Sequence, residues 1–201
     1  MALPRSPYCT PDEYLAAERE STVRHEYFQG QIITMAGESL QHSQICVNLT
    51  GEVRQQLKGR DCQALSPNMK VKTGDAGLFS YPDLTVVCGK PLFLDNQKDV
   101  LLNPTAIFEV LSPGTELYDR GEKFFRYRNF LDSLMDYVLV SQVRAMVERY
   151  SRQPNGQWLY SPVDGLSGRI KIESIGCALE LAEIYARVEF PEMAEPDPTI
   201  R

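Results

Sequence analysis

Two stretches of this chain each place one acidic residue inside a short apolar run. The first is Tyr81-Pro82-Asp83-Leu84-Thr85-Val86-Val87, and the second is Ala106-Ile107-Phe108-Glu109-Val110-Leu111. Their β-branched and aromatic residues, bounded by Pro, Gly and Ser, predict two buried strands. Burying a carboxylate is costly unless the group is paired or binds a metal ion. Two such residues therefore predict a site that holds a cation.

The size and composition of the chain predict one globular domain. Its 201 residues, 43% hydrophobic and 24% charged, are ordinary for such a domain, which we expect to cover residues 1–190. We expect the acidic, proline-rich tail, residues 191–201, to be disordered. No apolar run approaches the ~20 residues needed to span a bilayer, and the first residues lack the apolar core of a signal peptide. We therefore expect a cytoplasmic protein.

The net charge and the cysteines exclude few classes of function. The formal net charge of −6 is unlike the basic footprint of a typical nucleic-acid binder, but it does not decide function. The five cysteines are odd in number, and no two of them stand at C-x-x-C spacing. We therefore expect neither a disulfide framework nor a zinc site. Most of the cysteines are expected to be buried reduced thiols.

The first part of the chain predicts helices around a hairpin. Thr10, followed by Pro and Glu in the pattern of a capping box, predicts a helix that runs to about Glu20. Two short strands are expected around a turn at Gly30. From Ser39 to about Lys58 an apolar residue recurs at every fourth position, which predicts a long amphipathic helix.

The later segments predict more strands than helices. Thr115 is a candidate cap for a helix that runs to about Leu131, and a short helix is expected at residues 179–185. The other segments are predicted strands: residues 62–65, 69–73, 136–140, 145–150, 158–161 and 169–173. This order predicts an α/β fold, with a mixed central sheet flanked by helices and additional antiparallel strands.

The two acidic residues have different alternatives. Asp83 follows a proline at the start of a strand, where an acid often only satisfies a turn. Glu109 shares one face of its strand with Ile107 and Leu111, and both faces are apolar. Glutamate is almost never fully buried without a partner. For Glu109 a functional role is therefore favoured over a structural ion pair.

Lys123 lies in the helix that follows Glu109. It shares a stripe with Tyr127 and Phe130, at positions i+4 and i+7, and we expect these aromatic side chains to face the sheet. Lys123 would then reach the sheet as well. The alternative is an exposed pair with Asp119, one turn earlier, which would stabilise the helix only slightly.

An ordered set of segments carries a family resemblance. They are Glu26-Tyr27-Phe28-Gln29-Gly30-Gln31-Ile32, His42, Tyr81-Pro82-Asp83, Glu109-Val110-Leu111-Ser112-Pro113, and Asp119-Arg120-Gly121-Glu122-Lys123 with Tyr127. This set resembles the PD-(D/E)XK nuclease superfamily and, within it, the Uma-type restriction endonuclease family, formerly catalogued as a domain of unknown function. The resemblance implies a restriction-endonuclease-like fold.

The resemblance also implies a chemistry. Asp83 and Glu109 would hold Mg²⁺, with Mn²⁺ as an alternative ion, and the substrate would be a DNA phosphodiester. The superfamily places its lysine two residues after the glutamate, but that position is Leu111 in this chain. The resemblance therefore implies that Lys123 supplies the missing ammonium, which would orient the attacking water or stabilise the phosphate in the transition state.

Two more residues are candidates for the catalytic pocket. Glu26 is either a third metal carboxylate or an ordinary exposed acid, and His42 is either a pocket residue or a hydrogen-bonded histidine at the edge of the core. The rival function is a non-catalytic module that keeps the nuclease fold and binds nucleic acid or protein. No DNA-contact surface is evident, because basic residues alternate with acids. A homodimer could form such a DNA-contact surface from two copies of the chain, and dimers are the commonest assembly.

Overall fold

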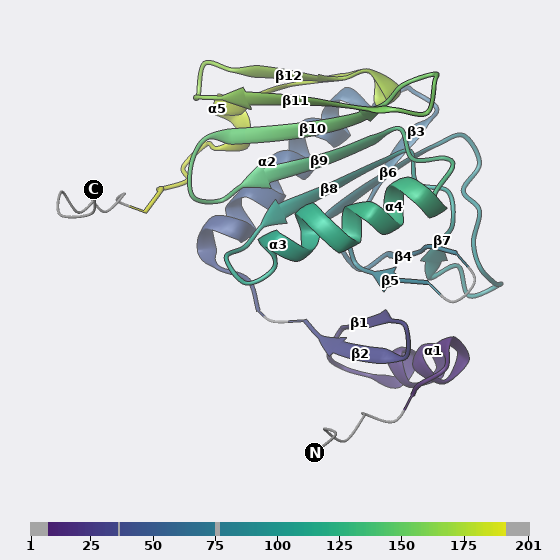
Figure 1. The fold of residues 1–201 in the computed structure, drawn as a ribbon. Coiled ribbons are helices and arrows are strands. Elements are labelled where there is room, and N and C mark those ends of the chain that lie inside the picture. Colours follow the sequence, from purple (N-terminus) through teal and green to yellow (C-terminus); the bar gives the residue numbers. More distant parts are fainter. Residues whose placement is uncertain (1–7, 36, 75–76, 192–201) are drawn as a thin grey trace, which may run out of the picture.

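The computed structural model describes residues 8–35, 37–74 and 77–191. They form a six-stranded sheet, a five-stranded sheet and a two-stranded hairpin, with helices packed against them (Figure 1). Residues 192–201, which make up nearly all of the tail expected to be disordered, lie outside the described residues. None of the described helices is both long enough and apolar enough to cross a membrane.

The six-stranded sheet carries the two acid-bearing segments. Its order is β11-β10-β9-β8-β6-β3, and only β8 and β9 run parallel to each other. Glu109 lies in β8, an interior strand in which every residue is buried. The strands are β3 (Cys62–Leu65), β6 (Leu84–Cys88), β8 (Ala106–Leu111), β9 (Asp136–Ser141), β10 (Met146–Arg152) and β11 (Trp158–Asp164).

Helices cover both faces of this sheet (Figure 1). On one face, Phe108 and Val110 belong to the same apolar cluster as α2 (Leu40–Gln56) and α5 (Leu181–Ile184). On the other face, Ile107 and Leu111 belong to a cluster with the helix that follows β8. Because side chains alternate along a strand, Glu109 points to this second face, as the sequence predicted. A hairpin of β12 (Arg169–Ile172) and β13 (Cys177–Glu180) contributes to the first cluster.

The five-stranded sheet brings the N-terminal segment to the core. Its order is β2-β1-β5-β4-β7, and β1 pairs with β5 through Tyr27 and Phe79. The predicted turn at Gly30 is confirmed, with a φ of +87° that glycine tolerates best. The elements are α1 (Pro11–Glu20), β1 (His25–Phe28), β2 (Gln31–Thr34), β4 (Lys70–Lys72), β5 (Phe79–Ser80) and β7 (Val100–Leu101), and α1 begins with the expected capping box.

The helix after β8 differs from the prediction. It consists of α3 (Glu116–Tyr118), a π-helical segment η1 (Asp119–Lys123) and α4 (Phe124–Phe130), which follow one another directly. Thr115 does not cap it, because its backbone is already helical and its hydroxyl bonds that of Ser112.

One aromatic residue of the predicted stripe does not face the sheet. Tyr127 and Phe130 both lie in α4, after the π segment, and Phe130 is the last residue of this helix. Tyr127 is fully buried, whereas Phe130 is 48% exposed, so the expectation for Phe130 was wrong. Asp119 and Lys123, at the two ends of η1, are both buried.

Two smaller expectations were also wrong. The predicted short helix at residues 179–185 is only α5, because residues 177–180 form β13. Cys62 and Cys88 form a disulfide, which the sequence had not predicted. They stand directly opposite each other in the antiparallel pair of β3 and β6, and this register cannot be read from cysteine spacing. The other three cysteines are free.

Candidate functional site

Glu109 and Lys123 form a buried ion pair between the sheet and the helix. Lys123 Nζ lies 3.0 Å from Glu109 Oε1. The residues are only 5% and 3% exposed, respectively. The lysine reaches the sheet because η1 turns its side chain inward, onto the face of β8 that carries Glu109. The exposed pair considered from the sequence is therefore wrong, although Asp119 is still a partner of Lys123.

Lys123 contacts three carboxylates that come from three elements. Besides Glu109 on β8, its Nζ lies 3.3 Å from Glu26 Oε1 on β1 and 3.3 Å from Asp119 Oδ1 on the same helix. Such an ammonium is held in one position, since each carboxylate restrains it from a different direction. The structure thus brings Glu26, Glu109 and Lys123 together.

Glu26 is buried, so its interpretation as an ordinary exposed acid is wrong. Its Oε1 accepts a hydrogen bond of 3.2 Å from the backbone N–H of Tyr81. Tyr81 precedes Asp83 by two residues, so this bond ties β1 to the segment that presents Asp83. The Glu26 carboxylate therefore contacts both Lys123 and the backbone of the segment that leads to Asp83.

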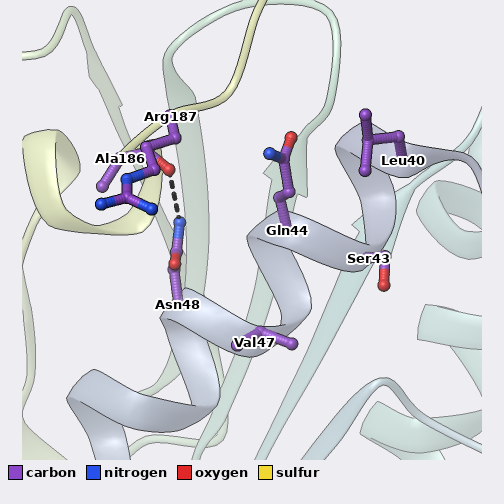
Figure 2. Close-up of a pocket in the computed structure, with 7 residues that line it drawn as sticks. All are labelled: Leu40, Ser43, Gln44, Val47, Asn48, Ala186 and Arg187. Carbon is purple, nitrogen blue, oxygen red and sulfur yellow. Dashed lines mark hydrogen bonds between the residues drawn. The ribbon is translucent and has the colours of Figure 1, made fainter.

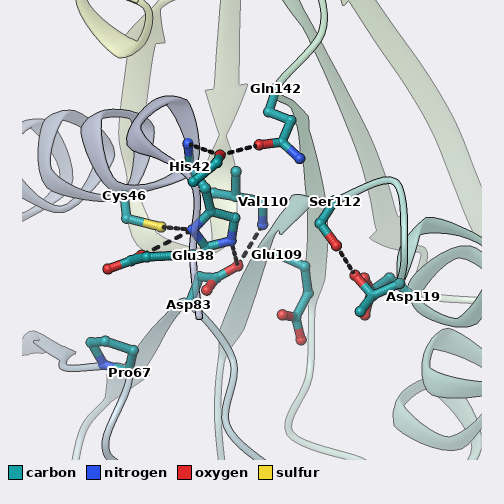
Figure 3. A network of polar contacts seen from close by, with 12 residues as sticks. Glu38, His42, Cys46, Pro67, Asp83, Glu109, Val110, Ser112, Asp119 and Gln142 are labelled. Atoms are coloured by element: carbon teal, nitrogen blue, oxygen red, sulfur yellow. Dashed lines mark hydrogen bonds and ion pairs between the residues drawn. The ribbon is translucent and has the colours of Figure 1, made fainter. Parts of the chain in front are cut away.

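Asp83 stands at the start of β6 and contacts β8 directly. Its Oδ2 accepts a 2.7 Å hydrogen bond from the backbone N–H of Val110, the residue after Glu109. Figure 3 shows the two carboxylates beside each other at this point. The Asp83 side chain remains 18% exposed, so it is the more accessible of the pair. Its bond is to a neighbouring strand and not to a local turn, unlike that of a simple turn acid.

His42 joins the site through Asp83. Its Nε2 lies 3.4 Å from Asp83 Oδ2, while its Nδ1 faces Glu38 Oε2 at 3.1 Å and Cys46 Sγ at 3.5 Å (Figure 3). The backbone N–H of His42 donates to Ser39 Oγ, the N-cap of α2. The start of α2 thus fixes the imidazole against Asp83, so His42 lies within the predicted pocket.

The buried charges shift one another's pKa values. Burial raises the pKa of Glu109 well above its usual value; Lys123 lowers it, but Asp119, Asp83 and Glu26 raise it again. Burial also raises the pKa of Asp119. Burial alone would lower the pKa of Lys123, but the carboxylates of Glu109 and Glu26 outweigh it and raise the pKa well above the ordinary value. Lys123 is therefore an ammonium at neutral pH.

His42 also carries a raised pKa. Burial lowers it, but the contacts with Asp83 and Cys46 raise it by more. Even with His42 charged, acids outnumber cations around Lys123. A bound cation would therefore lower the raised pKa values of Glu109 and Asp119 and favour their charged forms.

The donor atoms of this site fit a divalent metal ion. Lys123 and Tyr127 contact Oε1 of Glu109, and no described residue donates a hydrogen bond to its Oε2. His42 and Val110 contact Oδ2 of Asp83, and no described residue donates a hydrogen bond to its Oδ1. Carboxylate oxygens are the ligands that Mg²⁺ and Mn²⁺ prefer. Each acid therefore keeps one oxygen for a cation.

Sequence reasoning missed several residues that line this site. Asp119 was considered only as a surface partner, but it is buried and its Oδ1 lies 3.3 Å from Lys123 Nζ. Tyr127 was placed inward but given no role, although its hydroxyl contacts Glu109 Oε1 at 3.4 Å and Ser80 Oγ at 2.6 Å. Glu38 and Cys46 lie four residues to either side of His42, a helical spacing that could have revealed them.

Two surface features lie apart from these carboxylates. Arg120 pairs with Glu116 and Glu148, and Arg126 pairs with Glu122, so these basic side chains are largely neutralised.

A shallow pocket of about 270 Å³ lies between α2 and the residues that follow α5 (Figure 2). Its lining contains none of the predicted site residues; it consists of Leu40, Ser43, Gln44, Val47, Asn48, Ala186 and Arg187.

Comparisons with known proteins identify a family for this chain. A family model named Uma2, described as "Putative restriction endonuclease", matches residues 11–182. Two uncharacterized proteins of Synechocystis sp. (strain ATCC 27184 / PCC 6803 / Kazusa) are similar in sequence. One, slr1290, is 35% identical over 184 residues, and the match covers 92% of this chain and 95% of slr1290. The other, sll1609, is 32% identical over 162 residues, and the match covers 81% of this chain and 91% of sll1609.

One solved structure shares the fold. It is a crystal structure described as "a putative nuclease belonging to DUF820" from Anabaena variabilis ATCC 29413. It matches with a TM-score of 0.73 and 18% identity, over 88% of this chain and 97% of that one. At this identity the likeness concerns the fold alone. The predicted restriction-endonuclease-like α/β fold, with its additional antiparallel strands, is confirmed.

Proposed function

The chain belongs to the Uma2 family, and from this membership we propose that it is a metal-dependent endonuclease that hydrolyses DNA phosphodiester bonds. One observation supports the proposal above all others. The ammonium of Lys123 is buried 3.0 Å from Glu109, on the strand that Asp83 contacts through the Val110 N–H. Two acids and a lysine in this arrangement match the roles that the PD-(D/E)XK resemblance implies.

The two acids would hold the metal ion. We assign Asp83 and Glu109 as the ligands of Mg²⁺ or Mn²⁺, because each keeps one carboxylate oxygen that accepts no hydrogen bond from the described residues. When bound, such an ion lowers the pKa of water and neutralises the charge that builds on a phosphate. Asp83 is the more exposed ligand, so DNA would approach the site from its side.

Lys123 would act through its charge. Because Glu109 and Glu26 raise its pKa well above the ordinary value, it does not lose its proton at neutral pH and cannot serve as a general base. Its N–H groups can orient the attacking water or stabilise the phosphate oxygens in the transition state. Leu111, at the position of the superfamily's lysine, is buried in the apolar cluster of the helix face, so this role falls to Lys123.

Glu26 and His42 would position these groups. Glu26 holds the ammonium of Lys123 and the Tyr81 N–H with one oxygen, so we assign it as a positioning residue for both catalytic segments. His42 contacts the Asp83 oxygen that also accepts from Val110. It therefore orients the carboxylate, leaving the other oxygen for the metal ion.

The decisive experiment is cleavage of DNA by purified variants. Supercoiled plasmid and circular single-stranded DNA are incubated with Mg²⁺ or Mn²⁺ and wild type, Asp83→Asn or Glu109→Gln. These changes remove charge but keep shape. Because Glu109→Gln leaves Lys123 with one carboxylate fewer and should lower stability, thermal unfolding must show that each variant is folded at the assay temperature. The matched control is Glu122→Gln, a half-exposed acid on the same helix that forms an ion pair with Arg126. We expect nicking by wild type and the control, and none by the two site variants.

Two results would contradict the proposal. If nicking survives in both Asp83→Asn and Glu109→Gln, these residues do not hold an essential metal ion. If wild type neither cleaves either DNA nor binds Mn²⁺ more tightly than Asp83→Asn does, the chain is the non-catalytic module considered from the sequence. Binding of Mn²⁺ is measured by its electron paramagnetic resonance signal, which does not depend on cleavage.

A further inference from the structure

We propose that Glu38, His42 and Cys46 form a second cation site, which binds Zn²⁺ and lies against Asp83. The site is separate from the pair of Asp83 and Glu109, and it does not depend on the proposed endonuclease activity. Its three side chains come from the start of α2 and the residue before its N-cap. They combine a carboxylate, an imidazole and a thiol, whereas the pair of Asp83 and Glu109 offers oxygen alone.

The helical spacing brings the three groups to one face. Glu38, His42 and Cys46 follow one another at intervals of four residues, so their side chains lie along the same side of the chain as it enters α2 (Figure 3). One ligand atom from each lies within 4.8 Å of the others. The three ligand atoms are therefore within reach of one ion.

The distances match those of a tetrahedral zinc centre. With Zn–S of about 2.3 Å and Zn–N of about 2.0 Å, tetrahedral angles separate sulfur from nitrogen by about 3.5 Å. Cys46 Sγ and His42 Nδ1 lie 3.5 Å apart. Nitrogen and carboxylate oxygen would be separated by about 3.4 Å, and Glu38 Oε2 lies 3.1 Å from the same Nδ1. A zinc ion would therefore need only small side-chain adjustments.

The other nitrogen of His42 supplies an independent argument. Histidines that bind zinc nearly always place their second ring nitrogen on a carboxylate or carbonyl group, which fixes the tautomer and orients the ring. In this chain Nε2 faces Asp83 Oδ2 at 3.4 Å. Zn²⁺ would displace to solvent the proton that Nδ1 shares with Glu38 Oε2, while Nε2 keeps its own proton toward Asp83. The Asp83–His42 contact therefore prepares the imidazole as a ligand.

The ligand types select the ion. Thiolate and imidazole prefer a borderline ion such as Zn²⁺, and Mg²⁺ prefers oxygen alone. The Glu38 side chain is 55% exposed, and Cys46 and His42 are partly buried, so an ion can enter from solvent and a water can complete its coordination. The two neighbouring sites would therefore hold different metals.

Direct metal binding tests the proposal without DNA. Zn²⁺ is titrated against a chromogenic chelator with wild type, Cys46→Ser and Glu38→Gln, and Co²⁺ is added separately to record absorption. We expect one zinc equivalent in wild type, at least a tenfold weaker affinity in each variant, and a thiolate-to-cobalt charge-transfer band that Cys46→Ser abolishes. Cys9→Ser is the matched control, because Cys9 is also free and partly buried but lies far along the chain from this site.

The same measurements can overturn the proposal. Equal zinc affinity in wild type, Cys46→Ser and Glu38→Gln would show that any binding occurs elsewhere, and a cobalt spectrum without the thiolate band would exclude Cys46 as a ligand. Asp83→Asn adds a further check, because loss of the carboxylate behind the histidine should weaken zinc binding about tenfold. Since none of these readouts uses cleavage, failure of the endonuclease proposal would leave their outcome unchanged.

Discussion

The ammonium of Lys123 and the carboxylate of Glu109 meet 3.0 Å apart in the interior, between the helix after β8 and the sheet itself. Removing one member of a buried ion pair leaves the other charge without compensation, which costs about 3–5 kcal/mol. Lys123 is the more sensitive member, because Glu26 and Asp119 also depend on it. The pair therefore links the proposed catalysis to the stability of the fold.

Lys123→Met should lower both activity and stability. The methionine fills a similar volume but leaves three acids without their cation, so we expect the free energy of unfolding to fall by about 3 kcal/mol. Cleavage should fall at least about 100-fold, as for removal of a charged group that stabilises a transition state. Urea unfolding and plasmid nicking measure the two effects. Lys123→Arg, which keeps the charge, is the control. Full activity in Lys123→Met would contradict the assigned role.

Glu26→Gln separates positioning from metal binding. We expect slower cleavage, by about tenfold, because Lys123 loses one of the groups that hold it. The Mg²⁺ concentration for half-maximal activity should stay as in wild type, whereas Glu109→Gln should raise it. A Mg²⁺ titration of both variants provides the measurement. If Glu26→Gln raises the Mg²⁺ requirement as much as Glu109→Gln does, Glu26 is a metal ligand and our assignment is wrong.

Much of this site could be predicted from the sequence, for identifiable reasons. Asp83 and Glu109 were recognisable because each interrupts an apolar run, and the strand alternation correctly placed Glu109 on the face of Ile107 and Leu111. Lys123 was placed inward by its spacing from Tyr127. These inferences need only local periodicity, which the fold preserves over short distances.

Other features depend on arrangements that local patterns do not contain. Phe130 is exposed at the last residue of α4, although its spacing from Lys123 and Tyr127 fits the apolar stripe. The disulfide depends on the register of β3 against β6, which sets Cys62 opposite Cys88. Both are consequences of tertiary packing and could not be read from residue spacing.

The Cys62–Cys88 disulfide should stabilise the protein measurably. It closes a loop of 26 residues, for which chain entropy in the unfolded state predicts about 3 kcal/mol. We expect Cys88→Ala to unfold at a lower temperature than wild type under oxidising conditions, and the two to converge when reductant is added. Cys9→Ser serves as the control, since Cys9 is a free thiol. Identical melting curves for wild type and Cys88→Ala without reductant would contradict this prediction.

Asp99 should make stability fall at acid pH. Its hydrogen bonds to Arg19, together with Lys70, lower its pKa to about 2 despite partial burial. A carboxylate whose pKa is lowered by folding stabilises the fold at pH values above its unfolded-state pKa, here 3.8. This contribution disappears as the pH falls toward the folded-state pKa of about 2. Because Asp99 and Arg19 are partly exposed, we expect this contribution to the free energy of unfolding to be at most about 1 kcal/mol. The difference in unfolding free energy between wild type and Asp99→Asn should vanish from pH 4 to pH 2. A constant difference would contradict the assignment.

Bound zinc should raise the Mg²⁺ requirement of cleavage, if both proposals hold. Zinc on His42 Nδ1 would place a divalent charge beside Asp83, which His42 contacts at 3.4 Å. The two ions would lie on opposite sides of the imidazole, and Glu38 and the Cys46 thiolate would neutralise part of the zinc charge. The remaining repulsion should still make Mg²⁺ bind Asp83 and Glu109 more weakly. We expect one equivalent of Zn²⁺ to raise the half-saturating Mg²⁺ concentration several-fold in wild type and to have no such effect in Cys46→Ser. Equal responses of the two proteins would show that zinc acts at another place, such as the catalytic carboxylates themselves.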